Sequence, residues 1–204
     1  MSKNVIIIGQ SGVGKSSLIN MICHRANAPT SNDTTGCTRE EKGYTCNLGG
    51  QLSCQVHDTI GLEEGFWGFL FAPKAEKRLK TYLKDSRKPW HLMVYCIPGN
   101  RGLKKSHARN FKKFKSVADK LGVPVVVVVT HLEDFGGSLK NWWLENLDTL
   151  KNLGIPDTTK HACVTALPKE ELDKYYKKGQ LYDDSCRDVK NLIRSILWPS
   201  TGHR

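Results

Sequence analysis

The stretch VIIIGQSGVGKSS, residues 5–17, decides the fold of this chain. A β-branched run, typical of a buried strand, passes directly into a glycine-rich loop that ends in a lysine and two serines. Residues 9–16 match the phosphate-loop pattern G-x-x-x-x-G-K-[ST] at every fixed position, between a strand signal and a helix signal. Backbone N–H groups at the start of a helix bind anions, so the stretch predicts a nucleotide phosphate site.

The residues of this loop have different expected roles. Backbone N–H groups of residues 12–17 are expected to converge on the β-phosphate. Lys15 is expected to reach the β- and γ-phosphate oxygens, and the Ser16 hydroxyl to bind Mg²⁺. The phosphate-binding set that this predicts is Ser11, Gly12, Val13, Gly14, Lys15, Ser16 and Ser17.

The size and the cysteine usage of the chain indicate an intracellular globular protein. Its 204 residues suit one domain, residues 1–204, with a proper core. The seven cysteines include no Cys-x-x-Cys pair, so the sequence indicates neither a zinc site nor a disulfide framework. An odd cysteine count without a secretory signal favours a reducing, cytoplasmic compartment.

The formal net charge of +11 comes largely from residues 74–88 and 101–115. Such a surplus favours phosphate ligands, anionic membrane surfaces or nucleic acid. We interpret both segments mainly as the solvent-facing sides of amphipathic helices, with an anionic membrane surface as a candidate partner. Aromatic residues do not alternate with the basic ones, so nucleic acid is not an expected partner. The longest apolar run, residues 123–129, is too short to cross a bilayer.

Strand and helix signals alternate along the whole chain, which predicts an α/β fold with helices on both faces of a mostly parallel sheet. A Gly49-Gly50 turn predicts a hairpin, which makes one edge strand antiparallel. The six predicted strands are residues 5–8, 44–48, 51–57, 91–97, 123–130 and 161–165. The predicted helices are residues 15–23, 75–86, 104–121, 139–152 and 184–198.

Two further elements predict groups around the metal and the γ-phosphate. Asp58 ends a predicted strand and begins a D-x-x-G pattern, so it would hold Mg²⁺ through water while the N–H of Gly61 meets the γ-phosphate. Thr38 follows the metal-binding serine by 22 residues and would bring its hydroxyl to Mg²⁺ and its N–H to the γ-phosphate. Thr34 and Thr35 are alternatives for that role.

The loop after the five-valine strand predicts which base is bound. Residues 130–133, THLE, stand where GTPases carry [NT]-K-x-D, whose carboxylate accepts from guanine N1–H and the 2-amino group. Adenine lacks those donors, so Glu133 predicts selection of guanine, with Asp134 as the alternative acceptor. His131 replaces the lysine that flanks the base and has a ring that can stack on the purine. After the next strand, Thr165-Ala166-Leu167 resembles the S-A-[KL] element of GTPases, which implies that Ala166 and Leu167 present a backbone N–H to guanine O6.

Taken in order, these elements resemble the P-loop GTPase domain, or G domain, of the translation-factor-related class, and the resemblance covers a core of about residues 3–198. GCTRE, residues 36–40, resembles the switch sequences of Era-like proteins. THLED, residues 130–134, and CIPGNRG, residues 96–102, resemble immunity-associated nucleotide-binding GTPases and chloroplast outer-envelope import GTPases. The resemblance implies a three-layer fold with a six-stranded sheet, binding of GTP or GDP with Mg²⁺, and nucleotide-dependent dimerisation across the nucleotide face.

The sequence leaves open whether the chain hydrolyses GTP at a useful rate. Ras-like members carry a water-orienting glutamine directly after D-x-x-G, and Leu62 stands there instead. GTP turnover must then be slow, or another group must orient the water, for which Gln10 and Ser11 are candidates. Arg39 or Arg101 could act as an arginine finger, supplied by the same chain or by a partner. The chain is therefore expected to be a GTP-hydrolysing switch or, alternatively, a GTP-binding assembly scaffold with little hydrolysis.

Overall fold

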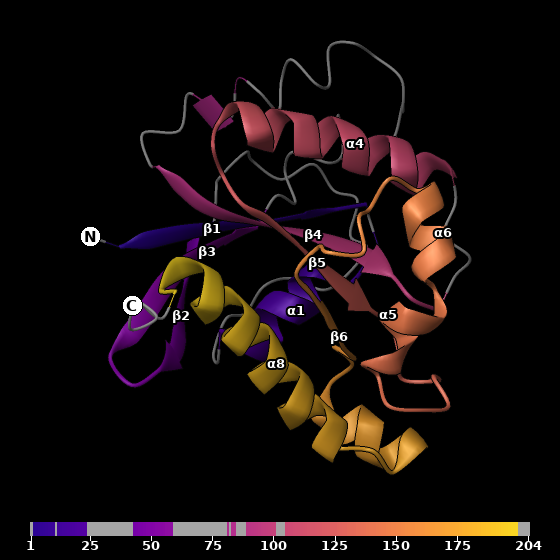
Figure 1. Cartoon of the computed structure of the whole chain (residues 1–204). Coiled ribbons are helices and arrows are strands. Elements are labelled where there is room, and N and C mark those ends of the chain that lie inside the picture. Colours follow the sequence, from indigo (N-terminus) through magenta and orange to yellow (C-terminus); the bar gives the residue numbers. More distant parts are fainter. Residues whose placement is uncertain are drawn as a thin grey trace, which may run out of the picture.

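The computed structural model describes residues 2–10, 12–23, 43–58, 81, 83–84, 89–100 and 105–199, with the backbone alone for residues 105–109. Their strands form one six-stranded sheet in the order β2-β3-β1-β4-β5-β6 (Figure 1). The strands are β1 Lys3–Gly9, β2 Gly43–Gly49, β3 Leu52–Asp58, β4 Trp90–Pro98, β5 Val125–Thr130 and β6 His161–Cys163. All neighbours are parallel except the edge pair β2 and β3. The predicted fold class is confirmed.

The two faces of the sheet have separate hydrophobic cores, because successive side chains of a strand point to opposite sides. Val5 and Ile7 face α1 Lys15–Ile22 and α8 Gln180–Leu197, whereas Ile6 and Ile8 face the opposite core. That second core includes side chains of α4 Lys105–Lys120, α5 Asn141–Glu145 and α6 Leu147–Asn152. Figure 1 shows α4 on one side of the strands and α1 with α8 on the other. The result is the expected three-layer arrangement.

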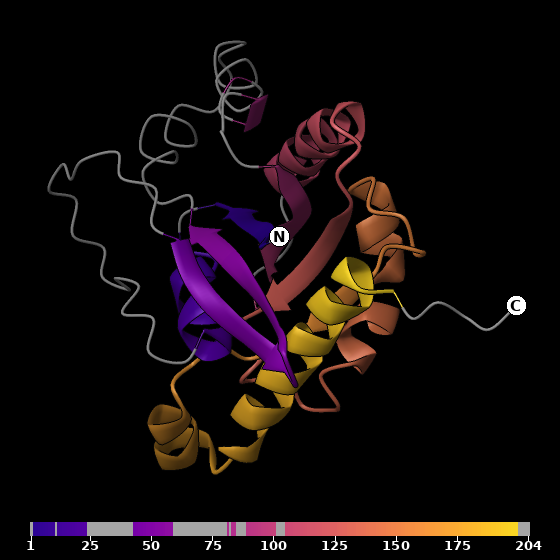
Figure 2. The ribbon, with the colours of Figure 1, turned by 90° about the vertical axis from the view of Figure 1, so that its left-hand side faces the viewer.

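The hairpin at one edge of the sheet forms as its glycines predict. Gly49 and Gly50 have φ angles of 99° and 60°, in the left-handed region that a tight hairpin turn requires and that glycine adopts without strain. Cys46 of β2 lies opposite Cys54 of β3. Figure 2 shows this hairpin at the edge of the sheet that faces the viewer.

The predicted single helix over residues 139–152 is wrong, because the chain forms α5 and α6 with a break at Asn146. The Asn146 side-chain amide donates to the carbonyl oxygen of Trp142 at 2.8 Å, and its backbone has φ −111° and ψ 13°. An asparagine side chain that bonds to the nearby backbone competes with continued helix formation. The break between α5 and α6 coincides with this local bond.

The remaining differences from the predicted elements concern where some of them begin or end and one segment that was not predicted. β5 begins after Pro124, β6 ends at Cys163, and α8 begins at Gln180, four residues earlier than predicted. The sequence did not predict α7 Lys169–Glu171 or the π-helix η1 Leu172–Tyr176. The predicted helix over residues 75–86 lies almost entirely outside the described residues.

Two further properties of the described part of the chain concern membrane-spanning helices and cysteines. No helix in it is both long enough and apolar enough to cross a bilayer. Its cysteines are all buried free thiols, namely Cys23, Cys46, Cys54, Cys96, Cys163 and Cys186.

Candidate functional site

The phosphate loop runs close to the neighbouring strand β4. A Cβ atom at Gly9 would lie 2.7 Å from Cγ2 of Val13 and 2.8 Å from the carbonyl oxygen of Cys96, so only glycine fits there. Gly12 and Gly14 have φ angles of 76° and 80°, which let the chain turn from β1 into α1. The backbone thus takes the tight path that a phosphate loop requires.

Lys15 and Ser16 begin α1, and their side chains have different hydrogen-bond partners. The ammonium of Lys15, which is 5% exposed, donates to the carbonyl oxygen of Gln10 at 3.0 Å and so folds back across the loop. The Ser16 hydroxyl donates to Oδ2 of Asp58 at 3.2 Å. Asp58 ends β3, and β3 is the parallel neighbour of β1. Two of the three residues predicted to hold the metal, Ser16 and Asp58, therefore lie side by side.

The Ser16–Asp58 pair fits a hard divalent cation. One carboxylate and one hydroxyl oxygen are the kind of ligands that Mg²⁺ takes from a protein, with the other positions left to water and phosphate. Asp58 is 7% exposed, so its charge lies where water screens it little. This pair is consistent with the predicted Mg²⁺ site.

Thr130 joins the phosphate loop to the base loop. Its hydroxyl lies 2.7 Å from the carbonyl oxygen of Val13 and 3.2 Å from that of Ile97, and the residue is fully buried. The shorter bond crosses from the end of β5 to the turn before α1. Thr130 was not among the predicted site residues, although the first position of the [NT]-K-x-D pattern was a signal that could have indicated it.

His131 and Glu133 of this base loop have different neighbours. A Cβ atom at Gly14 would lie 3.0 Å from Nε2 of His131, so the imidazole lies against the phosphate loop. His131 has a φ of 60°, unusual for a residue other than glycine. Glu133 is half-buried, and its Oε2 accepts a hydrogen bond from the Thr165 hydroxyl at 3.3 Å. The structure thus brings Glu133 to residues 165–167.

Asp134, the alternative acceptor, is exposed and lies beside a different group. Partial burial, the negative charges of Asp134 and Glu133, and a hydrogen bond to Asp134 together raise the pKa of the Tyr176 phenol. Asp134 therefore lies next to η1, and the contact with Thr165 belongs to Glu133.

The loop at residues 165–167 is held from both sides. Its first backbone N–H, that of Thr165, donates to the Ser185 hydroxyl of α8 at 3.2 Å. The preceding N–H, that of Val164, donates to the carbonyl oxygen of Val129 at 2.8 Å. Ala166 is buried and Leu167 is half-buried at this end of the sheet. Sequence reasoning did not find Ser185, which carries no motif signal.

The structure therefore brings most of the described candidate residues together at the carboxyl ends of the parallel strands, where open α/β sheets bind ligands. Three further predicted residues belong to the phosphate loop and the first turn of α1. Gln10 and Ser17 are half-buried there, and Gly12 is exposed. The predicted Ser11, Thr38 and Gly61 lie outside the described residues, as do Thr34, Thr35, Arg39, Leu62 and Arg101.

The fold and this arrangement define a P-loop nucleotide-binding domain of the GTPase class. The chain belongs to the family described as 50S ribosome-binding GTPase, whose model matches residues 4–131. It is 25% identical over 215 residues to GTPase Der of Campylobacter concisus, covering 96% of this chain and 44% of that protein. It is 28% identical over 132 residues to GTPase Der of Nitratiruptor sp., covering 65% and 26%. The chain thus spans less than half the length of these curated relatives.

Solved structures of GTPases share the fold at low sequence identity. A dimerisation-deficient variant of Toc33 from Arabidopsis thaliana has a TM-score of 0.66 at 15% identity, with 98% of this chain and 86% of that chain covered. Era from Aquifex aeolicus bound to GDP·AlF4− has a TM-score of 0.56 at 20% identity, covering 89% and 57%. A probable GTP-binding protein EngB has a TM-score of 0.55 at 16% identity, covering 95% and 98%.

Proposed function

We propose that this chain binds GTP and GDP with Mg²⁺ and hydrolyses GTP to GDP and phosphate as a nucleotide-dependent switch. The observation that carries the proposal is the pair of side-chain contacts that flank the phosphate loop. Ser16 contacts Asp58 on the metal side, and Thr130 bonds to Val13 on the base side. Membership of a GTPase family supports the same function.

Phosphate binding would depend on Lys15 and on the backbone of residues 12–17. The ammonium of Lys15 would exchange the Gln10 carbonyl for β- and γ-phosphate oxygens, and the N–H groups at the start of α1 would face the β-phosphate. Ser16 and Asp58, with Thr38 from outside the described residues, would hold Mg²⁺. When bound, that ion offsets the negative charge of the β- and γ-phosphate oxygens.

We assign base recognition to the residues on the other side of the phosphate loop. The Glu133 carboxylate would accept from guanine N1–H and the 2-amino group, while His131 flanks the purine. Ala166 and Leu167 would present a backbone N–H to guanine O6. The Thr165–Glu133 contact supports Glu133 over Asp134 as the acceptor.

The hydrolytic step needs a group that orients water, and Leu62 cannot do so because its side chain neither donates nor accepts hydrogen bonds. Gln10, Ser11, Gly61 and an arginine, either Arg39 or Arg101, are the proposed contributors. An arginine from a second copy would complete the site only in a dimer across the nucleotide face. A well-placed arginine finger raises turnover by about 10³ to 10⁵.

Single-turnover GTP hydrolysis, measured against protein concentration, tests this proposal. A rate that rises with concentration indicates dimer-activated hydrolysis, and a constant measurable rate indicates an intrinsic switch. GTP binding without measurable turnover at any concentration would replace the proposal by the alternative, a GTP-binding assembly scaffold. The matched control is Lys15→Ala, which should lower GTP affinity by more than tenfold because phosphate charge then lacks compensation. Unchanged binding in that variant would contradict the phosphate site itself.

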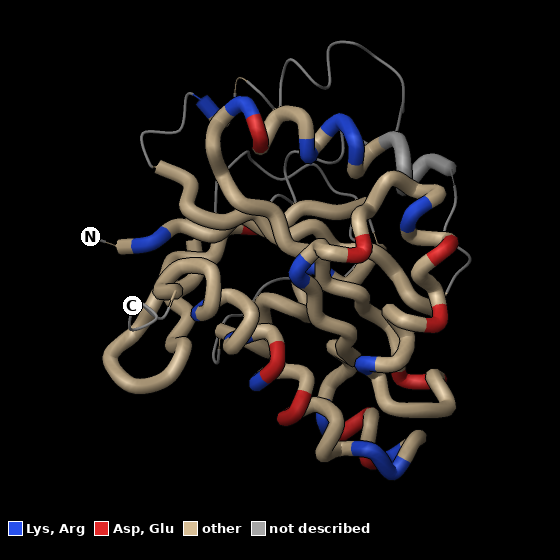
Figure 3. The backbone as a smooth tube through the Cα atoms, viewed as in Figure 1, with Lys and Arg blue, Asp and Glu red and all other residues tan. Residues whose placement is uncertain are grey.

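The remaining proposed partner is an anionic membrane surface, in a cytoplasmic setting. Figure 3 shows basic residues spaced along α4 and charges of both signs along α8. The exposed lysines of α4 include Lys112 and Lys120, and the net charge of +11 acts in the same direction. Attraction of this kind weakens as salt is added, since it acts between exposed charges.

A further inference from the structure

The segment between the base loops and α8 is a compact unit with its own internal bonds. We name residues 169–179, which include α7 and η1, the base wall. Leu172 of the wall is fully buried, and its carbonyl oxygen accepts from the backbone N–H of Lys178 at 3.2 Å. Asp173 accepts from the backbone N–H of Gly179 at 2.8 Å. These bonds fix the path of the wall independently of any ligand.

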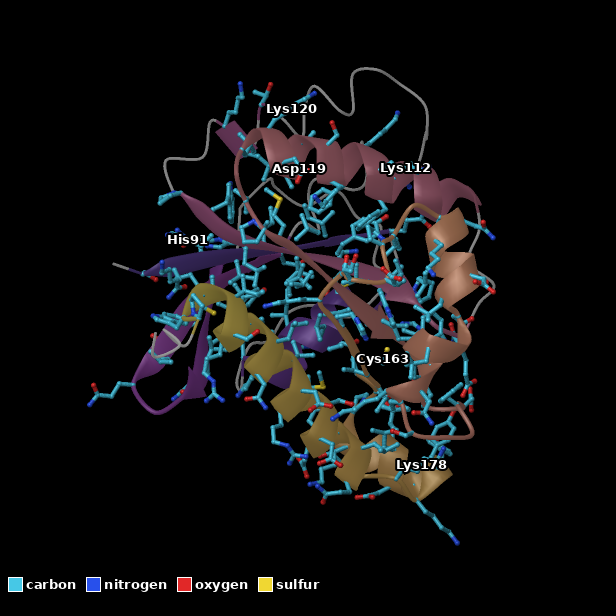
Figure 4. The ribbon with its side chains drawn as sticks, viewed as in Figure 1. His91, Lys112, Asp119, Lys120, Cys163 and Lys178 are labelled. Atoms are coloured by element: carbon cyan, nitrogen blue, oxygen red, sulfur yellow. The ribbon has the colours of Figure 1, made fainter. Side chains whose placement is uncertain are left out.

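The end of the base wall returns to the loop that carries Glu133. The ammonium of Lys178 donates to the backbone carbonyl oxygen of Glu133 at 3.0 Å, in a partly buried position. The two residues are 45 positions apart in the chain. Figure 4 shows Lys178 where η1 meets α8. Glu133 is thus held at two points, through its carboxylate by Thr165 and through its main chain by Lys178.

Two features of the base loop make the second contact useful. His131 stands where the GTPase pattern has a lysine, and its φ of 60° is a conformation that needs support from its surroundings. Glutamate has one more rotatable bond than aspartate, so a carboxylate at this position loses more conformational entropy when it is fixed. The Lys178 ammonium, bound to the backbone carbonyl oxygen of Glu133, restricts the main-chain position from which the Glu133 side chain extends. It does so without pairing with the Glu133 carboxylate.

We propose that Lys178 is a positioning residue for guanine recognition, which acts by fixing the main chain of Glu133 so that its carboxylate faces N1–H and the 2-amino group of the base. This inference rests on the proposed function, since it concerns the same nucleotide site. A lysine distant in the chain thus supplies a cation to the base loop.

The test compares binding of GDP and IDP, both with Mg²⁺, by competition against a fluorescent guanine nucleotide. IDP lacks the 2-amino group, so the ratio of the two affinities reports on the Glu133 contact. Lys178→Ala should lower GDP affinity by about tenfold and IDP affinity by less, because GDP loses the contacts of N1–H and of the 2-amino group whereas IDP has only N1–H to lose. Lys178→Arg should restore much of the ratio. Lys174→Ala is the matched control and should change nothing, since Lys174 is exposed and lies over the Tyr175 ring.

Three outcomes separate this inference from its alternatives. An unchanged GDP-to-IDP ratio in Lys178→Ala overturns the inference, because the lysine would then only stabilise the loop. Failure of the unsubstituted chain to bind GDP overturns the proposed function instead. Should Lys178→Ala fail to fold in a thermal denaturation measurement, Lys178→Met retains the aliphatic stem, removes the charge, and is read in the same way.

Discussion

A single methyl group at Gly9 would disturb both the sheet and the phosphate loop. One of the two atoms that it would approach within 3.0 Å, the carbonyl oxygen of Cys96, belongs to the backbone of β4 and cannot rotate away. The other belongs to Val13, which is buried and whose carbonyl oxygen binds Thr130. Close packing at this residue therefore fixes the position of the loop that follows.

We expect Gly9→Ala to lower the free energy of unfolding by about 1–3 kcal/mol, as overpacking does in well-packed cores. Nucleotide affinity should fall as well, because the loop must move. Gly136→Ala is the control, since its Cβ would meet no atom within 4 Å. Urea denaturation and nucleotide titration measure the two effects. Equal stability of the two variants would contradict the close approach of Gly9 to β4.

At the scale of elements, α8 does more than cover the sheet. Its Ser185 is 2% exposed and accepts the backbone N–H of Thr165, the first residue of the loop proposed to bind guanine O6. Cys186 of the same helix donates its thiol hydrogen to the carbonyl oxygen of Met21, in α1, at 3.2 Å. The helix thus connects the base side of the site with the helix that follows the phosphate loop.

Ser185→Ala should lower the free energy of unfolding by about 1–3 kcal/mol, because it leaves a buried N–H without its acceptor. Guanine nucleotide affinity should fall with it. Ser195→Ala, on the same helix, removes an exposed hydroxyl that donates to the carbonyl oxygen of Leu192, and it should change stability by less than about 0.5 kcal/mol. A Ser185→Ala variant as stable as Ser195→Ala, by chemical denaturation, would show that α8 does not support the loop.

The elements that sequence predicts well are those whose signal is local. The phosphate loop, the alternating strands and the Gly49-Gly50 hairpin all follow from neighbouring residues. Contacts between distant residues carry no such signal. The Lys178–Glu133 bond and the Thr165–Ser185 bond depend on how loops meet in space, so the base wall and the support from α8 could not be predicted. The choice between Glu133 and Asp134 required the same spatial information.

At the scale of the whole molecule, two histidines make stability depend on pH. Burial lowers the pKa of His161, partly opposed by its hydrogen bond to the carbonyl oxygen of Thr159. Burial and the nearby charge of Lys3 lower the pKa of His91. Between these lowered values and the ordinary value near 6.5, the unfolded chain binds more protons than the folded chain. Stability therefore increases with pH in that window and falls when the solution is acidified below about pH 6.5.

Urea denaturation at several pH values between 7.5 and 5 should show this loss of stability on acidification. His161→Phe should reduce the slope, because phenylalanine can keep the stacking on Trp143, whose ring centre lies 3.7 Å from that of His161, and cannot be protonated. His91 would account for the slope that remains. A hydrogen bond from Arg187 lowers the pKa of Asp184, so protonation of Asp184 changes stability only near or below pH 4. The chosen pH range therefore excludes its contribution. An unchanged slope in His161→Phe would remove His161 from this account.

The hydroxyl of Thr130 has a consequence for how the site opens. Because it bonds to the carbonyl oxygen of Val13, the turn before α1 and the end of β5 cannot separate without breaking a buried bond. Local opening of either segment then exposes the other, so the two behave as one cooperative unit. In hydrogen–deuterium exchange, the amides around Val13 and those around Thr130 would lose protection together. Their protection would rise together when either half of a nucleotide, its phosphates or its base, is bound.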